Sequence, residues 1–179
     1  MHRAVFLDRD GVLNESQVID GIPLPPRTID QVEIIAGVEQ AIEILKLYNF
    51  IPVVVTNQPD MARGTVLMEQ ILAINNHVGR LIGVEHFYTC FHDDEDRCPC
   101  RKPQPGLIHM AAKELGIDIK SSYLVGDRWR DVAAGQAAGC KSFFIDYSYS
   151  EKEPGPPFIR VSSLLEATKL IVGERDEEK

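Results

Sequence analysis

The sequence predicts an α/β protein built on a doubly wound, Rossmann-like parallel sheet of about five strands with helices on both faces. Short β-rich runs alternate along the chain with segments whose apolar residues recur at helical spacing. The segment IPVVVT at 51–56 is continuously apolar, which is typical of a parallel strand buried on both faces. With 179 residues, 44% of them hydrophobic, the chain can bury one core.

The expected strands and helices follow one another in alternation. The strands are short apolar runs at 3–7, 51–56, 86–89, 123–127 and 142–146. The helices are segments at 38–48, 67–81, 105–116, 131–139 and 162–172, and the third of these has proline at its start and glycine at its end. We therefore expect one domain over residues 1–173, followed by a frayed tail at 174–179.

The charge of the chain limits its partners. Its formal net charge is −8, so we expect no broad surface for nucleic acid or anionic membrane. No run reaches the ~18 apolar residues that a membrane span needs. The first apolar stretch, AVFL, runs directly into DRD and is unlike a signal peptide. We expect a cytoplasmic protein that is a monomer or weak homo-oligomer.

Polar side chains follow three of the expected strands, at the point where each strand ends. They are Asp8 and Asp10 after AVFL, Thr56 and Asn57 after IPVVV, and Asp127 after YLVG. The carboxyl ends of parallel strands meet at one edge of the sheet, and Lys102 lies in a loop that can reach this edge. Carboxylates that converge need a cation among them, and hard oxygen ligands suit Mg²⁺. The sequence therefore predicts a magnesium site that faces phosphate.

A second cluster has the spacing of a metal site. The stretch YTCFHDDEDRCPCRKP follows the pattern C-x-H-x5-C-x-C, with candidate ligands Cys90, His92, Cys98 and Cys100. Three thiolates and an imidazole form a closed tetrahedral set, as in structural zinc sites. The alternative is a set of buried thiols. Zinc would fold the loop at 90–102 and hold the residues just beyond it at the phosphate site.

Four short motifs resemble a known family. DRDGVL, TNQ, CRKP and GDRWRD are similar to the motifs of the haloacid dehalogenase (HAD) superfamily of phosphohydrolases and together span nearly the whole chain. Within it, FLDRDGVLN, VTNQPDMARG, CRKPQPG and VGDRWRDVAAG resemble the D-glycero-D-manno-heptose 1,7-bisphosphate phosphatases and their histidinol-phosphatase relatives. The resemblance implies a Mg²⁺-dependent hydrolase that removes the C7 phosphate of this sugar bisphosphate through an aspartyl-phosphate.

The resemblance also implies roles at the reacting phosphate. Asp8 would be the nucleophile and a Mg²⁺ ligand, and Asp10 the general acid and base, with its backbone carbonyl on the metal. Asp127 would complete the protein ligands of Mg²⁺. Thr56 and Asn57 would hold phosphoryl oxygens, while Lys102 would neutralise charge during transfer.

The rest of the substrate would meet arginine side chains. By resemblance Arg101 and Arg128 contact substrate, and Arg63 is a further candidate whose alternative is a surface ion pair. Many relatives have threonine where this chain has Val12, and we expect activity to survive that difference. The connections after Asn14 and at 57–101 are too short for a separate cap domain, so we expect an open site.

Other functions are compatible with parts of the pattern. Histidinol-phosphate phosphatase, or another small-molecule phosphatase, would use the same chemistry on a different substrate. A phospho-acceptor signalling domain also places acidic residues, Thr and Lys around Mg²⁺, but here the third strand leads into cysteines. A zinc-bearing binding module without catalysis would leave five residues unexplained: Asp8, Asp10, Thr56, Lys102 and Asp127.

Overall fold

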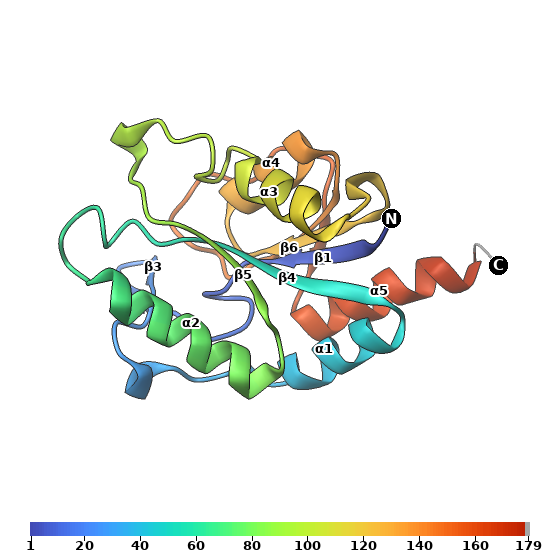
Figure 1. Cartoon of the computed structure of the whole chain (residues 1–179), viewed down its shortest axis with the longest axis horizontal. Coiled ribbons are helices and arrows are strands. Elements are labelled where there is room, and N and C mark those ends of the chain that lie inside the picture. Colours follow the sequence, from blue (N-terminus) through green and yellow to red (C-terminus); the bar gives the residue numbers. More distant parts are fainter. Residues whose placement is uncertain (178–179) are drawn as a thin grey trace.

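A parallel sheet of six strands organises the chain (Figure 1). The structure, a computed structural model, describes residues 1–177 and the side chains of residues 1–174. The strand order is β5-β4-β1-β6-β7-β8. The bounds are Arg3–Leu7 (β1), Phe50–Asn57 (β4), His86–Cys90 (β5), Tyr123–Gly126 (β6), Lys141–Ile145 (β7) and Ile159–Val161 (β8). The three strands that we expected to carry the site, β1, β4 and β6, are therefore neighbours in the sheet.

The sheet has one strand more than the five expected, and a hairpin adds two further strands. β8 pairs with β7 and is only three residues long, directly after a proline-rich stretch, so its sequence carried little strand signal. The hairpin joins Gln17–Ile19 (β2) to Ile22–Leu24 (β3) in a segment where no strand was expected. Asp20 and Gly21, at its tip, have φ values of 51° and 76°. Both values are positive, as in a type I′ hairpin turn.

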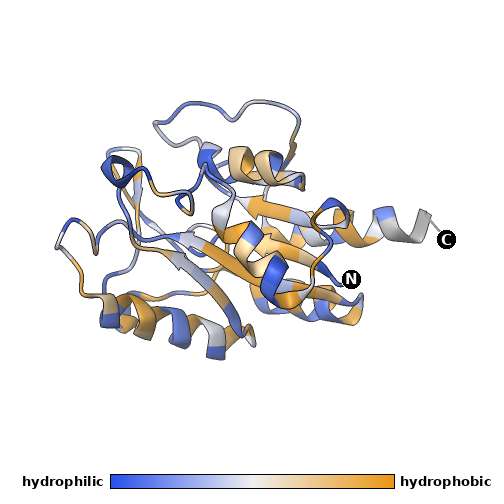
Figure 2. Ribbon diagram, turned by 45° about the horizontal axis from the view of Figure 1, so that its top comes forward, coloured by the Kyte–Doolittle hydropathy of each residue, from blue (hydrophilic) through white to orange (hydrophobic). Residues whose placement is uncertain are grey.

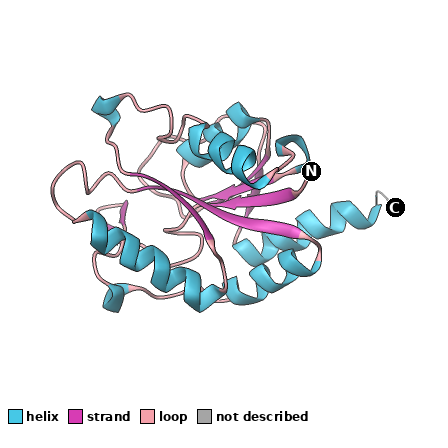
Figure 3. Cartoon of the chain, viewed as in Figure 1, coloured by secondary structure: helices cyan, strands magenta, loops and turns pink. Residues whose placement is uncertain are grey.

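Helices cover both faces of the sheet, as expected (Figure 3). On one face lie α1 (Val38–Leu47), α2 (Met68–Ile82) and α5 (Leu164–Glu177). On the other lie α3 (Gly106–Leu115) and α4 (Trp129–Ala138). Short 3₁₀ turns occur at Ile29–Gln31, Asp94–Asp96 and Ile119–Ser121.

The core follows the alternation of side chains along buried strands. In β1, Val5 and Leu7 pack toward α1, α2 and α5, whereas Ala4 and Phe6 pack toward α3 and α4. Figure 2 shows the result, with apolar segments gathered in the strands and polar ones in the loops. The small residues of α4 allow close contact, because a Cβ at Gly135 would lie 3.1 Å from Leu124 Cβ.

The last helix is longer than expected. α5 continues through Glu177, beyond the helix expected at 162–172, and the fraying expected from residue 174 stays a prediction. The residues there include glutamate and arginine, which are good helix formers. The remainder of the expected tail, residues 178–179, lies outside the described residues. Across the described chain, no helix is both long and apolar enough to cross a membrane.

Loops at one end of the sheet surround the carboxyl ends of the central strands. Figure 1 shows the β2–β3 hairpin, the loop after β4 and the loop after β5 at this end. Within residues 1–177 these connections hold a hairpin and 3₁₀ turns but no folded cap domain. The site is therefore framed by loops.

Candidate active site

Three carboxylates and one ammonium meet where β1 and β6 end. Lys102 Nζ lies 2.9 Å from Asp8 Oδ1 and 2.6 Å from Asp131 Oδ1. It also donates a 2.7 Å hydrogen bond to the Val55 carbonyl. Carboxylate oxygens of Asp8, Asp127 and Asp131 lie within 4.8 Å of one another. The cluster therefore carries more negative than positive charge.

The burial of this cluster shifts its protonation. Burial raises the pKa of Asp8 to about 6, although the Lys102 ammonium acts in the opposite direction. Burial and the charges of Asp8 and Asp131 raise the pKa of Asp127 well above its usual range. Burial by itself would lower the pKa of Lys102, but the Asp131 and Asp8 carboxylates outweigh it and raise that pKa. Lys102 is therefore a charged ammonium.

The residues present fit a divalent cation. Asp127 Oδ1 is buried and has no hydrogen-bond partner, which is costly for a carboxylate unless a cation completes it. Gly11 has a φ of 80°, and a Cβ at this position would collide with the Asp127 carboxylate. The DRDG turn thus brings the end of β1 directly against Asp127. Asp8 and Asp127 are the side chains that would hold Mg²⁺, the metal expected from the sequence.

Asp10 is held on every side by hydrogen-bond donors. The Arg9 guanidinium, which is fully buried, bonds both of its oxygens at 3.1 and 2.9 Å. Asn14 Nδ2 donates to Oδ1 at 2.9 Å, and Gln58 Nε2 donates to Oδ2 at 2.8 Å. Each oxygen therefore accepts two hydrogen bonds. To protonate a leaving group, Asp10 must exchange at least one of these bonds for the substrate oxygen.

The two polar residues at the end of β4 differ in position. The Asn57 side chain binds the backbone of Lys102 through Nδ2 to the carbonyl and Oδ1 to the N–H, both at 3.0 Å. This clamp holds Lys102 at the site. Thr56 is buried, accepts a 2.9 Å hydrogen bond from Gln58 and does not line the cavity. The expected contact of Thr56 with phosphate stays a prediction.

A cavity of about 340 Å³ extends from Asp8 and Asp127 to a rim of arginines. Its volume suits a small-molecule ligand. The expected substrate contacts Arg63, Arg101 and Arg128 all line it, and so does Arg130. Part of the wall is apolar and comes from the β3 segment, residues 22–25.

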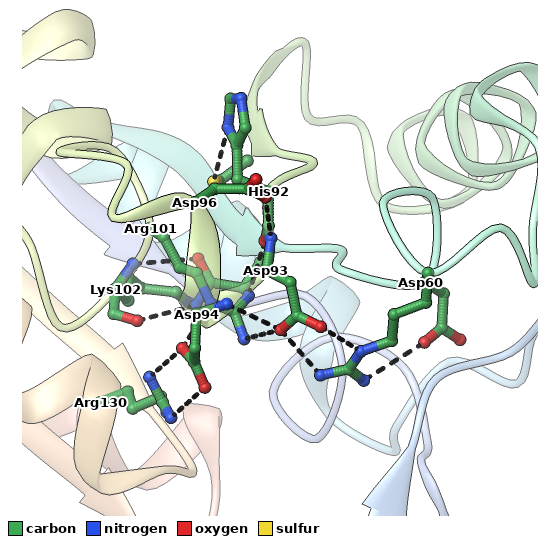
Figure 4. Close-up of polar contacts among 11 residues, drawn as sticks. Asp60, His92, Asp93, Asp94, Asp96, Arg101, Lys102 and Arg130 are labelled. Carbon is green, nitrogen blue, oxygen red and sulfur yellow. Dashed lines mark hydrogen bonds and ion pairs between the residues drawn. The ribbon is translucent and has the colours of Figure 1, made fainter.

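Each rim arginine is paired with a carboxylate. Asp94 accepts from Arg101 Nε at 2.8 Å and from both terminal nitrogens of Arg130 at 2.9 Å (Figure 4). Asp93 accepts from Arg63 at 2.6 and 2.9 Å, and this guanidinium lowers the pKa of Asp93 to about 2. The Arg63 ion pair therefore exists, and the same side chain lines the cavity.

Arg128 has its own partner outside the loop at 90–102. Its Nε donates to Glu151 Oε2 at 2.6 Å, and a second nitrogen of the same guanidinium contacts Glu151 Oε1. Glu151 comes from the segment between β7 and β8 and also lines the cavity. An arginine has five N–H donors, so a carboxylate partner leaves donors for a substrate anion.

The cysteine and histidine side chains of the loop after β5 converge. Ligand atoms of Cys90, His92 and Cys98 lie within 4.8 Å of one another, and Cys90 Sγ is 3.7 Å from His92 Nδ1. That distance is close to the ~3.5 Å edge of a tetrahedral zinc site. The fourth candidate, Cys100, bonds Cys98 Sγ through its N–H at 3.4 Å, while its own thiol faces Met110 Sδ at 3.5 Å. Three of the four expected ligands are thus grouped.

Comparisons with known proteins address the family. The model of a family described as HAD-hydrolase-like matches residues 99–163. A D-glycero-beta-D-manno-heptose-1,7-bisphosphate 7-phosphatase of Pasteurella multocida is 37% identical over 153 residues, which are 79% of this chain and 80% of that protein. The chain belongs to the HAD superfamily of phosphatases.

Other relatives extend the comparison for this HAD phosphatase. An Escherichia coli protein with the same name is 37% identical over 147 residues, which cover 75% of this chain and 74% of that one. The crystal structure of a D,D-heptose 1.7-bisphosphate phosphatase from B. bronchiseptica, complexed with magnesium and phosphate, has a TM-score of 0.84. The two are 27% identical, and the match covers 96% of this chain and 99% of that one.

Sequence reasoning did not single out two residues of this HAD phosphatase that the structure brings to the site. Asp131 is buried, binds Lys102, and also accepts a 2.9 Å hydrogen bond from the Arg128 N–H at the start of α4. Arg130 lies between Arg128 and Asp131 in the GDRWRD stretch, and its guanidinium pairs with Asp94. The sequence did offer one signal for Asp131. It is an acidic residue in the first turn of a helix, and that helix follows a strand that carries site residues.

Proposed function

We propose that this phosphatase removes the C7 phosphate of D-glycero-D-manno-heptose 1,7-bisphosphate, with the beta anomer as the preferred substrate, in a Mg²⁺-dependent reaction. The observation that carries the proposal is the presence of two regions for anions in one cavity. One is the Asp8, Lys102 and Asp127 cluster, which would take a phosphoryl group once Mg²⁺ is bound, and the other is the arginine rim. The names of the relatives support the choice of sugar and anomer.

Asp8 and Asp10 carry the chemistry in this proposal. An Asp8 carboxylate oxygen attacks phosphorus, the bond from phosphorus to the sugar oxygen breaks, and Asp10 gives its proton to that oxygen. Water then attacks the aspartyl-phosphate while Asp10 accepts a proton from it. Inorganic phosphate leaves and Asp8 is regenerated.

Positive charge at the site stabilises the transferring phosphoryl group. Bound Mg²⁺ would offset the excess of carboxylates and withdraw charge from phosphoryl oxygens. Lys102 is fixed by Asp131 and by the Asn57 clamp, so its ammonium needs little reorganisation when charge develops. We infer that Thr56 and Asn57 contribute hydroxyl and backbone N–H contacts to the phosphate, as the resemblance implies.

The second phosphate would bind at the rim. Arg101, Arg128 and Arg130 line the same cavity as the buried cluster, and guanidinium groups match phosphate geometry. Arg63 borders the same cavity through the loop after β4. A substrate with only one phosphate leaves these arginines to their carboxylate partners. The rim therefore favours a bisphosphate over a monophosphate.

We further infer that the loop at 90–102 holds structural zinc in a reducing, cytoplasmic environment. Burial raises the pKa of the Cys90 thiol to about 11, so this thiol is neutral near pH 7 without a metal and would release its proton on binding zinc. Elemental analysis of protein purified without chelator should find about one zinc per chain. A zinc-free, fully active protein would leave the cluster as free thiols.

Phosphate release from a substrate panel tests the function. The panel holds both anomers of heptose 1,7-bisphosphate, heptose 7-phosphate and histidinol phosphate, each with Mg²⁺, and Asp8→Asn serves as the matched control. We expect the highest kcat/KM for the beta anomer of the bisphosphate. A preference for histidinol phosphate would overturn the substrate, and weak release from every compound would move the substrate elsewhere while keeping the phosphatase chemistry.

A further inference from the structure

One segment joins the walls of the cavity. Residues 147–152, here called the strap, follow β7, and the sequence gave them no functional motif. The Tyr147 hydroxyl donates a 3.0 Å hydrogen bond to the Gly11 carbonyl in the DRDG turn. The Ser150 N–H donates to the Gly21 carbonyl at the hairpin tip, also at 3.0 Å. The strap thus connects the turn after β1 with the hairpin.

The strap also contacts the start of α4. Glu151 pairs with Arg128, and Lys152 Nζ lies 3.6 Å from the centroid of the Trp129 ring. The two contacted residues, Arg128 and Trp129, directly follow Asp127 in the chain. The strap is therefore placed over the end of β6, where the proposed cation ligand lies.

Tyr149 makes the contact that reaches the ligand itself. Its hydroxyl lies at the Asp127 carboxylate as a hydrogen-bond donor, and both side chains line the same small cavity beside the start of α4. Its ring stacks on Tyr147 with 5.5 Å between the ring centroids and 27° between the ring planes. The stack restricts rotation of the Tyr149 ring, which favours keeping its hydroxyl beside Asp127.

Asp127 needs such support, because its neighbours repel it. Asp8 and Asp131 lie within the same group of carboxylates, and Lys102 pairs with those two. On another side, the DRDG turn packs so closely that a Cβ at Gly11 would collide with Asp127. Asp127 Oδ1 has no hydrogen-bond partner, so a hydroxyl bond to this carboxylate leaves that oxygen for a cation.

We propose that Tyr149 is a positioning residue for Mg²⁺ binding: its hydroxyl orients Asp127 so that Oδ1 faces the cation. The inference rests on the proposed Mg²⁺ site, but not on any substrate. Groups that hydrogen-bond a metal ligand typically change metal affinity by about 10–100-fold when they are removed. Tyr149→Phe keeps the stacked ring and removes only the donor.

Mg²⁺ titration of the full chain tests the proposal without turnover. Protein is dialysed free of Mg²⁺ with its zinc content checked, and the half-saturating Mg²⁺ concentration is read from the fluorescence of Trp129, the single tryptophan. The midpoint of thermal unfolding at each Mg²⁺ concentration gives a second readout. We expect Tyr149→Phe to raise the half-saturating concentration about tenfold.

Tyr147→Phe is the matched control. It removes a hydroxyl from the same strap and the same ring stack, but that hydroxyl binds a carbonyl and not the ligand. We expect its Mg²⁺ affinity to stay within about twofold of the wild type, and both variants to unfold within a few degrees of the wild type without Mg²⁺. An unchanged affinity in Tyr149→Phe, or equal losses in both variants, would overturn the role. Absence of any Mg²⁺ response in the wild type would instead count against the metal site in the proposed function.

Discussion

At the buried end of the cavity three carboxylates lie around one ammonium that pairs with two of them, whereas at the rim every arginine has a carboxylate partner. Asp8 and Asp131 both pair with Lys102, and Asp127 keeps an oxygen without a partner. At the rim, by contrast, four arginines face four carboxylates: Arg63, Arg101, Arg128 and Arg130 pair with Asp60, Asp93, Asp94 and Glu151. The buried end has unbalanced charge and the rim has balanced charge.

This difference separates the chemistry of the site from its selectivity. Buried, unbalanced carboxylates favour binding of a cation and of the phosphoryl group that the cation neutralises. Balanced pairs near water contribute little to stability and can exchange partners when a ligand anion arrives. Substitutions at the buried end should therefore affect every substrate, and substitutions at the rim should affect only substrates that reach it.

The largest expected effect comes from Asp8→Asn. The amide cannot attack phosphorus, so turnover of every substrate should fall by at least about 10⁴-fold. Phosphate release from heptose bisphosphate and heptose 7-phosphate measures the loss. The matched control is Asp30→Asn, an exposed aspartate that does not line the cavity, and it should keep full activity.

The same variant also reports on charge at the buried end. Asp8→Asn removes one of the crowded carboxylates, so without Mg²⁺ its unfolding temperature should equal or exceed that of the wild type. Differential scanning calorimetry in chelator measures this. A marked fall in unfolding temperature would mean that lost activity reflects lost structure.

Asp131→Asn should have the next largest effect. Its side-chain oxygen can still accept the hydrogen bond from the Arg128 N–H, but the charge beside Lys102 is gone. We expect kcat to fall by about 10²-fold with the helix cap intact, because Lys102 loses its fixed position. Asp131→Ala should lose the cap as well and be less stable by about 1 kcal/mol. A kcat equal to that of the wild type in Asp131→Asn would contradict a role of Asp131 in holding Lys102 for catalysis.

Arg130→Gln should produce a smaller and selective change. The guanidinium lines the cavity through a pair with Asp94, so its loss should lower kcat/KM for the bisphosphate about tenfold, or ~1.4 kcal/mol. The kcat/KM for heptose 7-phosphate should change little. Arg160→Gln, which also loses pairs with carboxylates but does not line the cavity, is the matched control. Equal losses on both substrates would place Arg130 outside the phosphate contacts.

The smallest expected effect is a pH dependence of stability. In the metal-free chain the pKa of Asp8 is raised to about 6 from an ordinary value of 3.8, so the folded state holds this proton more tightly than the unfolded state. The resulting stability is present below about pH 4 and is lost as the pH rises through about 6. Mg²⁺ restores it, so the Mg²⁺-induced rise in unfolding temperature should grow by a few degrees between about pH 4.5 and 7. A rise that is constant over this range would contradict the raised pKa.

The central strands and their polar ends could be read from the sequence because the signals are local. AVFL and IPVVV are apolar runs of strand length, and the residues that follow them must come to one edge of a parallel sheet. The hairpin was missed although Asp20 and Gly21 form a common hairpin turn, because Pro23 and its proline neighbours favour a loop. β8 was missed because three residues carry too little pattern.

The missed site residues depend on contacts between distant parts of the chain. Asp131 meets Lys102 only after α3 and β6 have packed, and no spacing rule links the two. The stretch DDED at 93–96 has the composition of a solvated loop tip, yet Asp93 and Asp94 hold the rim arginines. Tyr149 belongs to no motif, and its role follows only from the packing of the strap against Asp127.

Paired kinetics on heptose 1,7-bisphosphate and heptose 7-phosphate test the division of the cavity most directly. The variants are Asp8→Asn at the buried end and a double variant, Arg128→Gln with Arg130→Gln, at the rim. We predict that Asp8→Asn lowers kcat/KM equally for both substrates. The double variant should lower kcat/KM for the bisphosphate and keep most of its kcat/KM for heptose 7-phosphate. Turnover by Asp8→Asn, or equal losses on both substrates in the rim variant, would contradict the account.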